Sequence, residues 1–389
     1  MGKLNGKNSI TSKQFNRGLV LKLIVTGACH TRIEISKQTG LAKMTVSKII
    51  QEFMDSGIVS ECEEEPTEVC GRNPIILRLS EKAPKVIGLL IFRDRIEAVL
   101  CDLSMRIIQK ESIPFQDLTE QQIMNYSYEV IDRILAKEKN IAGIGAAVIG
   151  PVDITNGVLL NPTRFYGIHD VHIKEYLQNR YDYPIFLDHD NNSAALAEKL
   201  FGIGKHVEDF IFLGISNGIG AGIISSGEVY HNHKGLAPEI GHMSIDCNGI
   251  LCSCGNRGCL EMYASSHVML EKMKKASKKD LSYEEFMHMS GSKRIDNILE
   301  QMLQDISVVI NNCVNMLQPE MIVLGHDCIE WQDSLVARLE DIVNEKKLAN
   351  DNQRILVRKA YFGKNAQLIG AAANVVDQAF KGDLKFLQS

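Results

Sequence analysis

The sequence has little that would indicate a membrane-bound, exported or strongly charged protein. No apolar run approaches the roughly 18 residues that a membrane-spanning helix needs. Residues 1–8 contain no apolar core of a signal peptide, so we expect a cytoplasmic protein with no membrane partner. The net charge is only −5, and the hydrophobic and charged fractions, 45% and 23%, are ordinary for a soluble protein. With 389 residues, the chain is long enough for two or three domains.

Positive charge is nevertheless concentrated at the N-terminus. Residues 1–48 contain nine Lys or Arg residues against a single acid, Glu34, whereas the rest of the chain is acidic overall. A basic N-terminal segment followed by an acidic remainder predicts one domain that binds a polyanion and another that does not.

The basic segment has the pattern of three helices. Apolar spacing predicts an amphipathic helix over 13–26. Thr31 can cap a second helix, with Glu34 completing a capping box and Gly40 ending it. A third helix is predicted from about 43 to 56. The short connection between the second and third helices indicates a helix-turn-helix.

Two strand-like runs, 58–60 and 75–79, follow the third helix and predict a wing. We therefore expect a winged helix-turn-helix domain over residues 1–80. An alternative is a helical protein-interaction module with a solvated basic face. The residues expected to contact DNA lie on the third helix and at the wing tip: Lys43, Met44, Thr45, Ser47, Lys48 and Arg72.

From residue 85 onward, strand-like and helix-like segments alternate, which predicts an α/β body. Strands are expected at 87–91 and 96–103, and a glycine-rich turn over 217–222 is expected to separate two later strands. A helix over 368–380 is expected to close the chain.

One imidazole and three thiols with the spacing of metal ligands lie within eighteen residues of this body, and Cys247 in the same stretch is a spare thiol. His242, Cys252, Cys254 and Cys259 form the pattern H-x9-C-x-C-x4-C, which is the ligand set of a closed structural Zn²⁺ site. The alternatives are disulfides or unrelated buried thiols. Disulfides are disfavoured in a chain with no export signal.

The same stretch resembles the signature of the ROK family, which contains bacterial sugar kinases and sugar-responsive repressors. E-x-G-H begins at Glu239, and C-x-C-G-x-x-G-C-x-E ends at Glu261. Gly71-Arg72-Asn73-Pro74 in the predicted wing is typical of the repressors. The resemblance implies a sugar-kinase-like body of two ribonuclease-H-like lobes, as in actin and hexokinase. The lobes are expected over 84–200 with 370–389, and over 201–369 with the zinc site.

The resemblance also implies a sugar site between the lobes. The matching positions are Gly150, His189, Asp190, Glu239, His242 and Glu261. Carboxylates and imidazoles suit this role because they accept directional hydrogen bonds from hydroxyl groups. Taken singly, Asp190 could be a helix N-cap and Glu239 a solvated acid.

Arg164 stands where family kinases carry an asparagine. Its guanidinium could pair with an anionic substituent of the sugar, such as a phosphate. It could equally be a surface residue on a shifted loop.

The nucleotide site of the kinases, in contrast, is degenerate in this sequence. The motif D-x-G-G-T aligns with residues 90–94, so Leu90 replaces the acid, and Phe92 and Arg93 replace glycines that let backbone amides approach phosphate. Phosphoryl transfer depends on positioning and charge neutralisation, so these changes argue against an enzyme.

These observations predict a transcriptional repressor that releases operator DNA when a sugar or sugar phosphate enters the cleft. We expect a homodimer or homotetramer. The main alternative is a ROK-type sugar kinase that regulates its own operon, and a sugar-controlled adaptor or activator would use the same parts.

Overall fold

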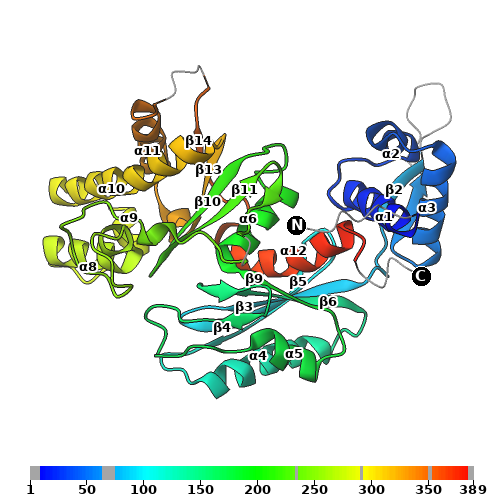
Figure 1. Cartoon of the computed structure of the whole chain (residues 1–389), viewed down its shortest axis with the longest axis horizontal. Helices are drawn as coiled ribbons and strands as arrows, with labels where there is room; N and C mark the ends of the chain where they lie inside the picture. Colours follow the sequence, from blue (N-terminus) through cyan, green and yellow to red (C-terminus); the bar gives the residue numbers. More distant parts are fainter. Residues whose placement is uncertain (1–8, 64–74, 233–234, 290–291, 349–352, 384–389) are drawn as a thin grey trace, which may run out of the picture.

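A computed structural model describes residues 9–63, 75–232, 235–289, 292–348 and 353–383. An N-terminal module lies beside a body of two lobes, each built on one five-stranded sheet (Figure 1). Among these residues, no helix is both long and apolar enough to cross a membrane.

Three helices and two strands form the N-terminal module: α1 (Ser9–Val25), α2 (Arg32–Thr39), α3 (Lys43–Asp55), β1 (Val59–Glu63) and β2 (Ile75–Leu79). The hydroxyl of Thr31 accepts a hydrogen bond from the backbone N–H of Glu34 at 3.2 Å, and the Glu34 carboxylate accepts one from the N–H of Thr31 at 3.1 Å. This capping box fixes the start of α2, and Gly40, with φ of 70°, ends it. The three predicted helices and the two wing strands are confirmed; α1 begins at Ser9 rather than at residue 13, and the two strands are antiparallel. Arg72 lies outside the described residues.

The first lobe contains a sheet in the order β5-β4-β3-β6-β9, with β3, β6 and β9 parallel. Helix α12 (Ala366–Phe380) covers one face of this sheet, and α4 and α5 lie on the other (Figure 1). Every residue of β6 is buried, as expected for a strand between two helical layers. The elements are β3 (Lys85–Ile91), β4 (Arg95–Cys101), β5 (Ile107–Pro114), α4 (Glu120–Leu135), β6 (Ile141–Val148), β7 (Val152–Asp153), β8 (Val158–Leu159), α5 (Ile173–Arg180) and β9 (Ile185–His189).

The second lobe repeats the arrangement with a sheet in the order β12-β11-β10-β13-β14. Its core includes the buried Trp331, whose indole N–H donates to the Tyr283 hydroxyl at 2.8 Å. The elements are β10 (Phe210–Ile215), β11 (Ile219–Ser225), β12 (Glu228–Val229), η1 (Ile240–His242), α7 (Glu261–Ala264), α8 (Ser266–Ser277), α9 (Tyr283–Met287), α10 (Lys293–Leu317), β13 (Met321–His326), η2 (Asp327–Glu330), α11 (Asp333–Glu345), β14 (Leu356–Lys359) and η3 (Gly363–Asn365).

The predicted glycine-rich turn over 217–222 is wrong in its extent. Strand β11 begins at Ile219, so Gly220 and Gly222 lie within the strand, opposite residues of β10. A Cβ on Gly222 would lie 2.1 Å from the backbone oxygen of Asn191, at the start of α6 (Asp190–Leu200). These glycines therefore let a helix approach the sheet closely.

Helix α12 (Ala366–Phe380) is held by backbone contacts on several sides. A Cβ on Gly145 of β6 would lie 1.8 Å from the oxygen of Ala371, and one on Gly370 would lie 2.2 Å from the oxygen of Ser193 in α6. A Cβ on Gly18 of α1 would lie 1.9 Å from the oxygen of Phe380. One helix thus touches the first sheet, α6 and the N-terminal module. The sequence-based domain limits stay a prediction, because α6 contacts strands of both sheets.

Candidate ligand cleft, metal centre and nucleic-acid interface

A polar cleft of about 540 Å³ lies between the lobes. This volume is in the range of small-molecule sites. The seven residues that the sequence marked as sugar contacts all line it: Gly150, Arg164, His189, Asp190, Glu239, His242 and Glu261. They come from the loop after β6, the loop between β8 and α5, the end of β9, the start of α6, the two ends of η1, and the start of α7.

Asp190 is the first residue of α6 and is almost fully buried. Its carboxylate lies 3.4 Å from Nε2 of His189 and 3.8 Å from Nε2 of His326. Burial lowers the pKa of His326, although Asp190 opposes this effect. The N-cap of α6 is His189, whose ring accepts from the N–H of Asn191, so the alternative that Asp190 serves as the N-cap is wrong.

Two further carboxylates complete the polar wall. Glu261 is buried and accepts a hydrogen bond from the N–H of Ile219 at 3.2 Å. A Cβ on Gly150 would lie 2.6 Å from Glu239 Oε1 and 2.7 Å from His189 Nε2, so only glycine leaves these two groups open to a ligand. The wall can accept several hydrogen bonds from one small polyhydroxylated molecule.

Residues 90–94, which the resemblance aligns with the nucleotide motif of the kinases, lie beside a second pocket of about 470 Å³ that is lined by bulky and charged side chains. The Phe92 ring stacks on the His326 ring with centroids 5.2 Å apart. The guanidinium of Arg95 lies over the Phe92 ring, 4.9 Å from its centroid. Glu97 is buried and pairs with Arg95 at 3.2 Å and with Lys110 at 3.0 Å. Asp94 also pairs with Arg95 at 2.8 Å, so two carboxylates of the chain balance these two cations.

Arg93 has a place that the sequence did not predict. Its side chain enters the cleft, where Nη1 donates to the backbone oxygens of Thr163 and Arg164. Arg164 lies at the exposed rim, with Nη2 3.4 Å from the Met262 sulfur. A charged residue in place of a motif glycine could have suggested a role for Arg93. Its position in the cleft was not predictable, because its hydrogen-bond partners lie seventy residues away in the sequence.

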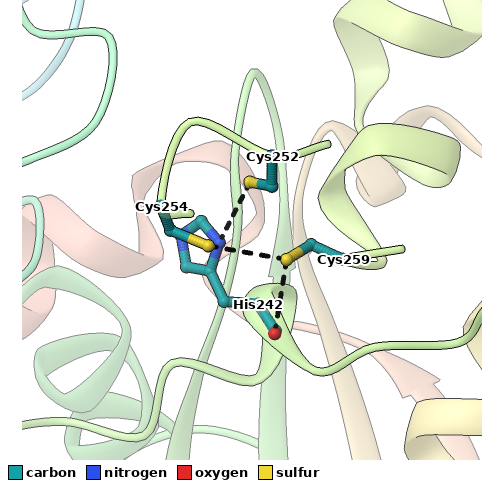
Figure 2. Close-up of side chains that lie close together, drawn as sticks. All are labelled: His242, Cys252, Cys254 and Cys259. Atoms are coloured by element: carbon teal, nitrogen blue, oxygen red, sulfur yellow. Dashed lines mark hydrogen bonds between the residues drawn. The ribbon is translucent and has the colours of Figure 1, made fainter. Parts of the chain in front are cut away.

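The four predicted metal ligands converge beside the cleft (Figure 2). Their ligand atoms all lie within 4.8 Å of one another. Cys252 Sγ is 3.6 Å from His242 Nδ1, and Cys254 Sγ is 3.6 Å from Cys259 Sγ. Cys254 and His242 also line the cleft, so the metal-binding loop forms part of its wall.

These separations fit one tetrahedral ion. Zn–S bonds of about 2.3 Å and Zn–N bonds of about 2.05 Å place sulfurs about 3.8 Å apart and sulfur and nitrogen about 3.6 Å apart. Burial and the neighbouring thiols raise the pKa of Cys259 to about 12. A thiol in this position loses its proton readily only when a cation takes the proton's place.

The exposed face of α3 carries the residues expected to contact DNA. Val46, Ile50 and Phe53 turn inward and are fully buried. The five predicted contact residues on this helix lie on the other face, either exposed or half-buried: Lys43, Met44, Thr45, Ser47 and Lys48. Met44 is 84% exposed, which is high for a large apolar side chain that lies beside a packed core.

Comparison with known proteins decides the family. The ROK family model matches residues 86–378, about three quarters of the chain. The chain belongs to the ROK family. It is 28% identical over 371 residues to the xylose repressor of Bacillus subtilis, covering 94% of this chain and 96% of that protein.

Two solved structures of ROK proteins share the fold. A ROK transcriptional regulator, described as a homologue of the Escherichia coli MLC protein, matches with a TM-score of 0.83 and 24% identity, covering 97% of this chain and all of that one. A ROK glucokinase from Streptomyces griseus matches with a TM-score of 0.67 and 20% identity, covering 74% of this chain and 98% of that one. The predicted two-lobed, kinase-like α/β fold is confirmed, and the kinase match leaves about a quarter of this ROK protein uncovered.

Proposed function

We propose that this ROK protein is a transcriptional repressor that binds operator DNA and releases it when a sugar enters the cleft. The observation that carries the proposal is the combination of a helix-turn-helix, with an exposed polar face on α3, and a body whose cleft offers buried hydrogen-bond acceptors. Full-length similarity to the Bacillus subtilis xylose repressor supports the same function.

The chain works without sugar phosphorylation in this proposal. The Phe92–His326 stack borders the pocket on the nucleotide side, and Asp94 and Glu97 together pair with the two cations there, Arg95 and Lys110, that could otherwise meet phosphates. Leu90, at the position of the kinase acid, is buried in β3 and offers no ligand for a metal–nucleotide complex. Asp190 then serves to bind a sugar hydroxyl.

A Zn²⁺ ion held by His242, Cys252, Cys254 and Cys259 has a structural role. Four protein ligands leave no position for a catalytic water. The ion fixes the loop that enters α7, and therefore the position of Glu261 in the cleft wall.

DNA recognition uses a symmetric assembly of two chains on an inverted repeat, with half-sites about one helical turn, or a multiple of it, apart. Lys43 and Lys48 neutralise phosphates, whereas Met44, Thr45 and Ser47 meet base edges. Arg72 in the wing enters the adjacent minor groove. A tetramer formed from two such dimers would use the same contacts.

The effector signal passes through α6 and α12. Asp190 begins α6, α6 packs along α12, and the last turn of α12 contacts α1 through Gly18. Because these contacts involve backbone atoms, a shift of α6 moves α12 and α1 together. A ligand changes DNA affinity only through its different affinities for the two arrangements.

The proposal is tested with the full chain. Duplexes selected from a random library are labelled, and binding is followed by fluorescence anisotropy with and without a panel of sugars. We expect sequence-specific binding that one sugar class weakens, and no sugar-dependent ATP turnover. Binding that does not discriminate the selected duplexes from random ones would contradict the proposal, as would phosphorylation of a sugar at ordinary enzymatic rates.

A further inference from the structure

Two guanidinium groups face a cleft whose other polar groups are mainly acceptors. Arg93 and Arg164 both line the cleft, and neither forms an ion pair with a carboxylate of the described residues. Other arginines of the chain, such as Arg95 and Arg338, are paired with carboxylates. The charges of Glu261, Asp190 and Glu239 act on Arg93 from a distance, but no carboxylate of the described residues holds its N–H donors in an ion pair.

The orientation of Arg93 leaves the edge formed by Nε and Nη2, which suits a bidentate anion, without an acceptor among the described residues. Only Nη1 has acceptors among the described residues, namely the backbone oxygens of Thr163 and Arg164. The opposite edge, formed by Nε and Nη2, lies against Gly218: a Cβ there would be 3.5 Å from Nη2 and 3.8 Å from Nε. The two parallel N–H groups of such an edge match the oxygens of a phosphate or carboxylate.

Gly218 also separates the open edge from the nearest acid. The same Cβ would lie 3.1 Å from Glu261 Oε2, so the glycine leaves space for a ligand hydroxyl that donates to Glu261 beside the open edge of Arg93. Burial lowers the pKa of Arg93, while Glu261 and Asp190 raise it. The guanidinium remains charged, because even a perturbed arginine stays protonated near neutral pH.

We infer that the open edge of Arg93, supported by Arg164 at the rim, is an anion-binding site, and that the effector is a sugar carrying an anionic substituent, of which a phosphate ester fits best. This inference rests on the proposed function of the cleft. The hydroxyls of the sugar bind Asp190, Glu239 and Glu261, and the anionic group binds Arg93. The residue that aligns with a kinase glycine thus selects the effector.

The test compares matched pairs of ligands on the full-length protein. Isothermal titration calorimetry measures the affinities of xylose, glucose and N-acetylglucosamine, of their terminal phosphate esters, and of glucuronate. We expect at least one phosphate ester to bind about tenfold or more tightly than its parent sugar, since hydrogen bonds to charged groups carry this much discrimination. Glucuronate separates a general preference for anions from a preference for phosphate.

Substitutions of Arg93 test whether its open edge, formed by Nε and Nη2, causes that preference. Arg93→Gln should abolish the preference for the phosphate ester while changing the affinity of the parent sugar less than about threefold. Arg93→Lys keeps the charge but not the two parallel donors, so it should retain only part of the preference. Arg95→Lys is the matched control, because Arg95 pairs with Glu97 and lines the second pocket rather than the pocket that holds the sugar contacts, so the preference should not change.

The outcomes separate this inference from the proposed function. If a neutral sugar binds as tightly as its phosphate ester and Arg93→Gln does not change that ratio, the anion site is refuted while the sugar cleft stands. If Arg93→Gln and Arg93→Lys weaken both ligand classes equally, Arg93 only fastens the segment at Thr163, and the inference is wrong. If no sugar of either class binds, the sugar cleft and the anion site fall together.

Discussion

The contact between α1 and α12 predicts that Gly18→Ala will disturb communication more than stability. A Cβ at this position would lie 1.9 Å from the oxygen of Phe380, whereas ordinary contacts begin near 3.4 Å, so the helices must separate by about 1.5 Å. Such overpacking costs about 1–3 kcal/mol. Replacing glycine within a helix recovers about 1 kcal/mol. We therefore expect the free energy of unfolding to fall by between zero and about 2 kcal/mol.

The effect on function should be larger than this modest loss suggests. Coupling between an effector and a second ligand is typically about 1–3 kcal/mol, so loss of about 1 kcal/mol reduces the effector-induced change in DNA affinity about fivefold. Effector affinity should remain within about twofold of wild type, because Gly18 is remote from the cleft. The assay is anisotropy of labelled operator DNA with and without effector, alongside calorimetric unfolding. Asn16→Ala, on the same helix, is the control.

A full effector response in folded Gly18→Ala protein would refute the reasoning. It would show that the module can move relative to α12 without losing the signal, and that coupling runs through the connection between β2 and β3 instead.

Three further predictions concern the metal, the DNA contacts and pH. Cys259→Ser should lower the zinc content measured by atomic absorption from one ion per chain to well below one. It should also weaken the effector response before the body unfolds, because the ion positions Glu261. Full zinc content in this variant would contradict the ligand set. Lys48→Ala should weaken binding to all DNA sequences alike and reduce the slope of log affinity against log salt by about one, and an unchanged slope would remove Lys48 from the phosphate contacts. The Asp188 carboxylate, 2.8 Å from Nε2 of His231, raises the pKa of this histidine; its stabilisation is therefore complete below the unfolded pKa of about 6.5 and is lost as pH rises through the folded pKa. Thermal unfolding of wild type and His231→Gln should accordingly converge with rising pH, and a difference that grows would contradict the assignment.

The N-terminal module was predictable because its signals are local. The capping box of Thr31 and Glu34, the terminal glycine at position 40 and the apolar spacing of α3 each act within a few residues. These features specify helix ends whatever the rest of the chain does.

The cleft residues that belong to a sequence motif, such as Asp190 and Glu261, were predictable. Those whose position depends on tertiary contacts were less so. The glycines of β11 suggested a turn, yet they are required by the approach of α6, which no local pattern reveals. The role of Arg93 likewise depends on Thr163, seventy residues further along the chain. Helix α10, in contrast, was predictable from its regular apolar spacing between Ile295 and Val314, but it was not predicted.

The central claim is that the cleft controls release from DNA, and one measurement tests it most directly. Wild type and Asp190→Ala are titrated onto labelled operator DNA, and xylose, glucose, N-acetylglucosamine and their phosphate esters are added to the preformed complexes. We expect both proteins to bind DNA with similar affinity and only the wild type to release it with effector, because Asp190 is buried in the cleft wall and remote from α3. Release of Asp190→Ala at the same effector concentration as wild type would contradict the account.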